Sequence, residues 1–191
     1  MQLLVVLVVT TELLYVINFF QSSSLEKVSF YKVTTAFAKD LQLDSSSRHL
    51  LDSVQIVGHS LGGGLAIISG AQSKTMAVAL SGPGARISGK SFHPPVTLDD
   101  LNQYTFNIVP DRDVVARFDD LADNFQKIRC NAAANNAFGC HAFVRSFCQI
   151  IYTCGTGSRP AICECHTKYG FPEPMTDGNE TFADLCPQTT N

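Results

Sequence analysis

Residues 54–66 read VQIVGHSLGGGLA, and they join an apolar run to a glycine-rich turn and a segment of small residues. The run Ser53–Val57 is short and rich in β-branched residues, which predicts a strand buried on both faces. After the turn, Leu65–Ala71 predicts a helix. A strand, a tight turn and a helix in this order are typical of an α/β fold.

The turn, Gly58–Gly62, has the pattern G-x-S-x-G, in which a serine occupies a sharp strand-to-helix turn. We expect a side chain at either flanking glycine to collide with the neighbouring helix or strand. Ser60 is then strained, with its hydroxyl exposed at the carboxyl end of the sheet. The helix N-terminus favours negative charge there, and the Leu61 N–H is an expected oxyanion donor. The alternative is a glycine-rich turn that only packs two elements together.

Other segments extend the α/β pattern along the chain. Three more apolar runs predict strands: Met76–Leu80, Tyr104–Val109 and Phe125–Arg129. Residues 26–42 predict a helix, because apolar side chains recur at spacings of three and four: Phe30, Val33, Phe37 and Leu41. The polar residues that follow, Asp44–Ser47, predict a loop. Alternating strands and helices predict a mostly parallel sheet flanked by helices.

A nucleophilic serine needs a base, and the base needs an orienting carboxylate. In the chain order serine, acid, histidine that goes with this motif, two acids follow the predicted strand Tyr104–Val109: Asp111 and Asp113. His141 and His166 are the candidate bases. His141 is favoured, because it opens an apolar helix and the flanking cysteines 140 and 148 can lock its loop.

All seven cysteines lie at or after Cys130, at positions 130, 140, 148, 154, 163, 165 and 186. This density predicts disulfides and an oxidising compartment, with one thiol left free or linked to another chain. A zinc site at Cys163, Cys165 and His166 is the alternative, although no second ligand pair is evident. The glycosylation sequon at Asn179 fits a secreted or lumenal protein.

The length, the net charge and the N-terminal composition indicate the domain organisation and exclude one class of function. The 191 residues fit one domain, predicted over 1–154, with a cysteine-rich and loop-rich tail over 155–191. The net charge of −3 is dispersed, which excludes nucleic-acid binding driven by phosphate contacts. Residues 1–20 are apolar but interrupted by Glu12, and no Lys or Arg precedes Lys27. This segment is either a buried strand, Gln2–Val9, or a signal peptide.

Three segments resemble the class 3, fungal-lipase-like lipase family: 54–66, 78–86 (VALSGPGAR) and 106–119 (FNIVPDRDVVARFD). The resemblance covers about Gln2–Ile151. It implies an α/β-hydrolase fold and hydrolysis of lipid carboxylic esters, at a lipid–water interface, without a metal or organic cofactor. It also implies the roles of three residues: Ser60 as nucleophile, Asp113 as orienting acid and His141 as base.

One departure from the family concerns the second oxyanion donor. The family has Arg-Gly-Thr or Arg-Gly-Ser after an early strand; here Thr10 or Thr11 takes that place, without the Arg-Gly pair. The family also has more chain before the serine motif, which implies a shortened amino terminus. Two other functions therefore stay open: a phospholipase or another ester hydrolase with the same catalytic residues, and a catalytically impaired lipase-like binding protein.

Overall fold

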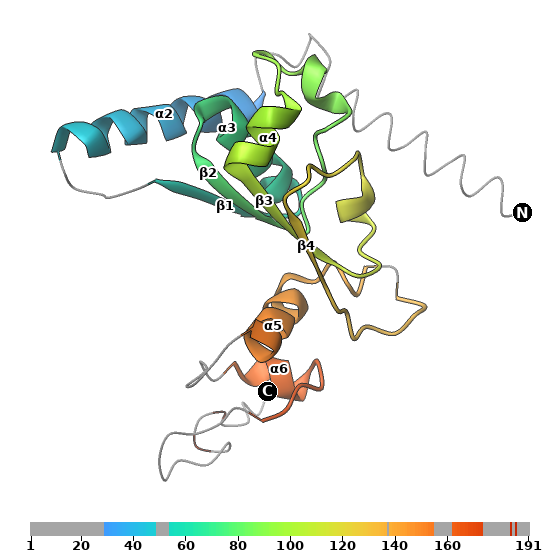
Figure 1. Ribbon diagram of the computed structural model, residues 1–191. Helices are drawn as coiled ribbons and strands as arrows, with labels where there is room; N and C mark the ends of the chain where they lie inside the picture. Colours follow the sequence, from blue (N-terminus) through green and yellow to red (C-terminus); the bar gives the residue numbers. More distant parts are fainter. Residues whose placement is uncertain are drawn as a thin grey trace, which may run out of the picture. The chain divides into compact units, whose positions relative to one another are not determined.

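The computed structural model describes residues 29–48, 54–136, 138–154, 162–173, 184 and 186 (Figure 1). The predictions for residues 1–20, Thr10, Thr11 and the sequon at Asn179 lie outside these residues. The chain divides into two compact units. Of the described residues, the first unit holds those up to Ile108 together with Val115–Gln126, and the second holds Val109–Val114 and those from Lys127 onward.

The described strands form one sheet in the order β1-β2-β3-β4: β1 (Gln55–His59), β2 (Met76–Leu80), β3 (Thr105–Pro110) and β4 (Phe125–Ile128). β1 pairs with β2 and β2 with β3, both in parallel, with His59 opposite Leu80 and Leu80 opposite Ile108. β3 and β4 run from the first unit into the second. The predicted parallel α/β architecture is confirmed, with each predicted strand found within two residues of its expected bounds.

β1 is less buried than its composition predicts. Within the described sheet it is an edge strand, paired to β2 alone, and Val57 is 73% exposed. α3 (Leu61–Ser73) packs against this strand. The prediction of a strand buried on both faces is therefore wrong, because β-branched composition reports strand propensity and not what covers each face.

The first unit also contains two more helices, α2 (Phe30–Arg48) and α4 (Leu98–Tyr104), and two short 3₁₀ helices, η2 (Ser88–Ser91) and η3 (Val115–Arg117). α4 was not predicted, although its N-terminal signal is present: the Thr97 hydroxyl accepts the Asp100 N–H at 3.1 Å. α2 and α4 both pack on α3. The buried core joins α2, α3, β2 and α4: Tyr31, Ile67, Ala71, Ala79, Ala85, Phe92, Val96 and Leu101.

α2 differs from its prediction in its bounds and in its buried face. The helix continues through the predicted loop Asp44–Ser47 and ends at Arg48. Three residues of the predicted apolar stripe are more than half exposed: Phe30, Val33 and Phe37. The buried side instead holds Tyr31, Thr35 and Ala38. The buried side chains of α2 are small or form hydrogen bonds, which allows close packing on α3. The Thr35 hydroxyl donates to the side-chain amide oxygen (Oε1) of Gln72 at 3.1 Å.

The second unit contains α5 (Phe143–Cys154) and α6 (Cys163–Thr167) and is cross-linked by disulfides. Three are described: Cys130–Cys140, Cys148–Cys165 and Cys163–Cys186. Cys148 and Cys165 join α5 to α6 in a small core with Phe171. The predicted disulfides are confirmed, and the zinc alternative is wrong because Cys163 and Cys165 both lie in disulfides. No helix among the described residues is long and apolar enough to span a membrane.

Candidate active site

Ser60 lies at the junction of β1 and α3. Its backbone has φ 58° and ψ −126°, an unusual conformation for a residue with a Cβ that costs about 1–3 kcal/mol. Hydrogen bonds fix it on both sides: its N–H donates to the Leu80 carbonyl at 3.1 Å, and its carbonyl accepts the Gly64 N–H at 3.1 Å. The predicted strain at Ser60 is therefore observed, at the start of the helix that the motif predicts.

The glycines around Ser60 have different roles. A Cβ at Gly58 would lie 2.1 Å from the Gly62 carbonyl oxygen, so this position excludes any side chain. A Cβ at Gly62 would meet nothing within 4 Å, so the prediction of a collision at either flank is wrong for Gly62. The close approach lies one residue later, where a Cβ at Gly63 would be 2.9 Å from the Gly82 Cα. Gly63 thus lets α3 pack directly on the loop after β2.

The N-terminus of α3 provides backbone donors beside Ser60. The first N–H groups of a helix have no acceptor within the helix, and the helix dipole makes this end positive. The Ser60 hydroxyl does not cap α3, and the first turn has no acidic residue to neutralise it. The Leu61 N–H is in this first turn. These features suit an oxyanion that forms next to the serine.

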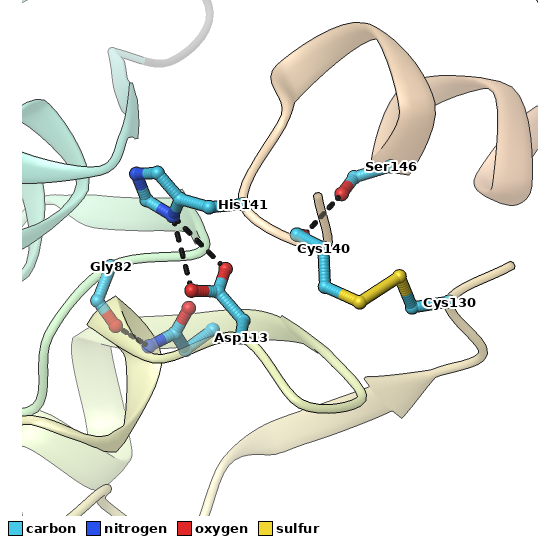
Figure 2. Close-up of polar contacts among 7 residues, drawn as sticks. Gly82, Asp113, Cys130, Cys140, His141 and Ser146 are labelled. Atoms are coloured by element: carbon cyan, nitrogen blue, oxygen red, sulfur yellow. Dashed lines mark hydrogen bonds and ion pairs between the residues drawn. A yellow bond between two sulfur atoms is a disulfide. The ribbon is translucent and has the colours of Figure 1, made fainter. Parts of the chain in front are cut away.

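Asp113 and His141 form a hydrogen-bonded pair in the second unit. His141 Nδ1 lies 3.1 Å from both carboxylate oxygens of Asp113 (Figure 2). The Asp113 side chain is fully buried and that of His141 is 17% exposed. A buried carboxylate needs a partner of this kind, because burial without one is costly. A carboxylate can only accept a hydrogen bond, so Nδ1 donates when Asp113 is ionised. Nε2 points away from Asp113 in Figure 2.

The chain positions this pair through two turns. Asp113 follows β3, and its N–H donates to the Pro110 carbonyl at 3.1 Å. His141 ends a second turn, where its N–H donates to the Phe138 carbonyl at 3.0 Å. The Cys130–Cys140 disulfide anchors the residue directly before His141 (Figure 2). The expected locking of the histidine loop by a cysteine is thus present at Cys140.

The structure places the other candidates elsewhere. Asp111 is exposed at the end of β3, where its backbone N–H donates to the Ile128 carbonyl at 2.8 Å. His166 lies in α6, with Nδ1 2.9 Å from the Phe171 carbonyl and Nε2 3.7 Å from Glu173. Asp113 and His141 are thus brought together within the second unit. Ser60 and Leu61 belong to the first unit.

Ser81, in the first unit, is a buried residue that the sequence did not indicate. It directly follows β2, has φ 57°, and is fully buried, and its hydroxyl has no hydrogen-bond partner among the described residues. The neighbouring loop is held by Asn107, whose side-chain amide donates to the Gly82 carbonyl at 2.8 Å. The sequence Ser-Gly-Pro-Gly after a predicted strand was the available signal.

Comparison with protein-family models and with curated proteins gives no match to this chain. The described residues hold no group of three or more His, Cys, Asp or Glu side chains placed to bind a metal. They do hold a strained serine at a helix N-terminus and, in the other unit, an oriented histidine.

Proposed function

We propose that this protein is a serine hydrolase with an α/β-hydrolase fold that acts on lipid carboxylic esters. The main support is the Asp113–His141 pair, because both carboxylate oxygens lie 3.1 Å from Nδ1 across 28 residues of sequence. A buried aspartate in this position fixes the tautomer and orientation of a histidine that acts as general base. The strained Ser60 and the parallel sheet are the second line of support.

The reaction requires that Ser60 and His141 meet. Ser60 follows β1, and Asp113 lies five residues after Ile108, the β3 residue opposite Leu80 of β2. The chain order serine, acid, histidine and the resemblance are the support for assigning Ser60 and Asp113 to one reaction. We propose that Ser60 and His141 are the nucleophile and the base of the same reaction.

The proposed mechanism is acyl transfer through a serine ester. His141 Nε2 takes the Ser60 proton as Oγ attacks the ester carbonyl, and the Leu61 N–H stabilises the oxyanion. His141 then protonates the leaving alcohol, and afterwards activates the water that hydrolyses the acyl-enzyme. Asp113 stabilises the imidazolium throughout. Thr11, outside the described residues, is the proposed second oxyanion donor.

Aromatic side chains near His141 in the sequence support an apolar substrate. Phe138, Phe143 and Phe147 are 66%, 49% and 38% exposed, and the rings of Phe143 and Phe147 stack at 5.9 Å. Exposed aromatic clusters are typical of surfaces that bind apolar ligands or lipid surfaces. They lie in the same unit as the base, which suits a long acyl chain or a lipid surface. The three disulfides support a secreted or lumenal location.

The test is hydrolysis of a short-chain and a long-chain p-nitrophenyl ester by the purified protein, beside Ser60→Ala. The proposal predicts activity in the wild type that disappears in the variant, with the long-chain ester preferred. Circular dichroism and thermal melting are the control that both proteins are folded. A folded wild-type protein that hydrolyses neither ester would contradict the proposal and favour the lipase-like binding protein instead.

A further inference from the structure

The Arg112 side chain links the loop of Asp113 to the loop of His141. Its Nη2 donates hydrogen bonds to the carbonyl oxygens of Cys130, at 3.1 Å, and Ala132, at 2.7 Å. Arg112 directly precedes Asp113, and Cys130 and Ala132 lie on the segment between β4 and His141. One guanidinium group therefore holds the two loops that present the acid and the base.

The Arg112 backbone is itself constrained. It has φ 65°, in the left-handed region that non-glycine residues rarely adopt. Hydrogen bonds on both sides fix the turn: the Asp111 N–H donates to Ile128, and the Asp113 N–H to Pro110. Strained residues of this kind persist where surrounding contacts determine the conformation. Here the conformation sends the Arg112 side chain toward the Cys130–Ala132 segment and the Asp113 side chain toward His141.

The Cys130–Ala132 segment is tied in turn to His141. Cys130 forms a disulfide with Cys140, the residue before His141 (Figure 2). Between these two contacts, the Asn131 side chain accepts a hydrogen bond from Arg145 of α5 at 2.7 Å and donates one to the Tyr169 carbonyl at 2.8 Å. The segment is thus a fixed support, and Arg112 ties the Asp113 loop to it in addition to the backbone hydrogen bonds of the turn.

We propose that Arg112 is a positioning residue for the Asp113–His141 pair, an inference that rests on the proposed function. Arg112 holds the acid loop at the distance where both Asp113 oxygens reach His141 Nδ1. Catalytic geometry is sensitive to displacements of this kind, since a shift of about 1 Å costs up to about 100-fold in rate. Because Arg112 is exposed and its two hydrogen bonds are to neutral carbonyls, we expect a more moderate effect, about a tenfold loss in kcat.

Four variants separate this role from general effects of charge and strain. Arg112→Met removes the donor and keeps the aliphatic stem. Arg112→Lys keeps an ammonium donor, and we expect it to recover most of the lost kcat. Arg112→Gly relieves the left-handed backbone but removes the guanidinium. Arg129→Met, next to Cys130, removes an exposed positive charge of the same kind and is the matched control.

Ester hydrolysis gives the first measurement. We expect kcat to fall about tenfold in Arg112→Met and Arg112→Gly with KM unchanged, and neither constant to change in Arg129→Met. A loss in Arg112→Gly despite a relaxed backbone shows that the guanidinium matters, independently of strain. Equal activity of all four variants would overturn the proposal.

Proton NMR of protein labelled with ¹⁵N-histidine gives the second measurement and needs no substrate. In the Ser60→Ala background, the His141 Nδ1–H in its hydrogen bond to Asp113 gives a downfield imidazole resonance. We expect this resonance to broaden or disappear in Arg112→Met and to persist in Arg129→Met. If wild-type protein hydrolyses no ester but the resonance responds in this way, the proposed function fails and the positioning role stands. A resonance unchanged in Arg112→Met would overturn the positioning role.

Discussion

Ser60 and Ser81 occupy corresponding positions directly after the neighbouring parallel strands β1 and β2. Ser60 donates its N–H to Leu80 at 3.1 Å and Ser81 donates to Ile108 at 2.8 Å, and their φ angles are 58° and 57°. They differ in their surroundings: Ser81 is fully buried, whereas Ser60 is partly exposed at the N-terminus of α3. The two serines therefore form a natural pair of test and control.

Replacing each serine with alanine should separate catalysis from structure. We expect Ser60→Ala to lower ester hydrolysis by about 10⁴-fold or more, because the nucleophile is lost. Ser81→Ala removes a buried hydroxyl that has no partner among the described residues, so stability should change by less than about 1 kcal/mol and activity by less than about twofold. The measurement is the rate on a p-nitrophenyl ester beside the melting temperature. An inactive but folded Ser81→Ala would contradict the assignment of Ser60, and not Ser81, as the nucleophile.

The two glycines of the G-x-S-x-G motif should respond differently to alanine. Gly58→Ala places a Cβ 2.1 Å from the Gly62 carbonyl, so the backbone must shift and the unfolding free energy should fall by about 3 kcal/mol. Gly62→Ala has room, and the higher helix propensity of alanine should leave stability equal or raise it by up to about 1 kcal/mol. Urea unfolding of both variants measures this. Similar losses of unfolding free energy in the two variants would contradict the close contact at Gly58 and the free space at Gly62.

The fold was largely predictable because its signals are local. The β-branched runs before Gly58 and around Met76–Leu80 set two strands, and the tight turn between β1 and α3 follows from the glycines. The buried face of α2 was not predictable, because Phe30 and Phe37 have the right periodicity for a core stripe and yet are exposed. Periodicity identifies a helix, but the small-residue surface of α3 decides which face packs on it.

The candidate site was predictable in part. Motif order and the resemblance select Asp113 and His141, and the structure places Asp113 Oδ1 3.1 Å from His141 Nδ1. The role of Arg112 depends on a left-handed backbone and on carbonyls 18 and 20 residues away, which no local pattern reports. The burial of Ser81 likewise depends on tertiary packing.

The aromatic side chains after His141 should control the preference for long acyl chains. Replacing Phe143 and Phe147 with serine removes the stacked exposed pair, and losing about 1.5 kcal/mol of apolar contact corresponds to about a tenfold lower preference for the long-chain ester. Hydrolysis of the short-chain ester should change little. Phe30→Ser, a similarly exposed residue on α2, is the control and should leave the chain-length ratio unchanged. An unchanged ratio in the double variant would place the acyl chain elsewhere.

The ion pair between Lys74 and Asp100 should make stability depend on pH. The hydrogen bond from Lys74 holds the pKa of Asp100 below its usual value. A carboxyl with a lowered folded-state pKa contributes stability above its unfolded pKa, and this is lost as the pH falls through the folded pKa. Because the pair is partly exposed, the contribution at neutral pH should be below about 1 kcal/mol.

A double-mutant cycle isolates this pair. Lys74 also lies over the Tyr104 ring, at 5.5 Å from its centre, so Lys74→Met alone removes two interactions. Urea unfolding of Lys74→Met, Asp100→Asn and the double variant, at neutral and at strongly acidic pH, measures the coupling. The coupling should be present at neutral pH and absent in acid. A coupling free energy that persists when Asp100 is protonated would show that the ion pair is not its source.

The most direct test of the proposed triad is covalent labelling with an alkyl fluorophosphonate, followed by peptide mapping. The wild-type protein should form one stoichiometric adduct, on Ser60, and none on Ser81. His141→Ala should slow labelling at least about 100-fold, because the serine loses its general base. Absence of an adduct on folded wild-type protein, an adduct on another residue, or equally fast labelling of His141→Ala would contradict the assignment of Ser60 as an activated nucleophile.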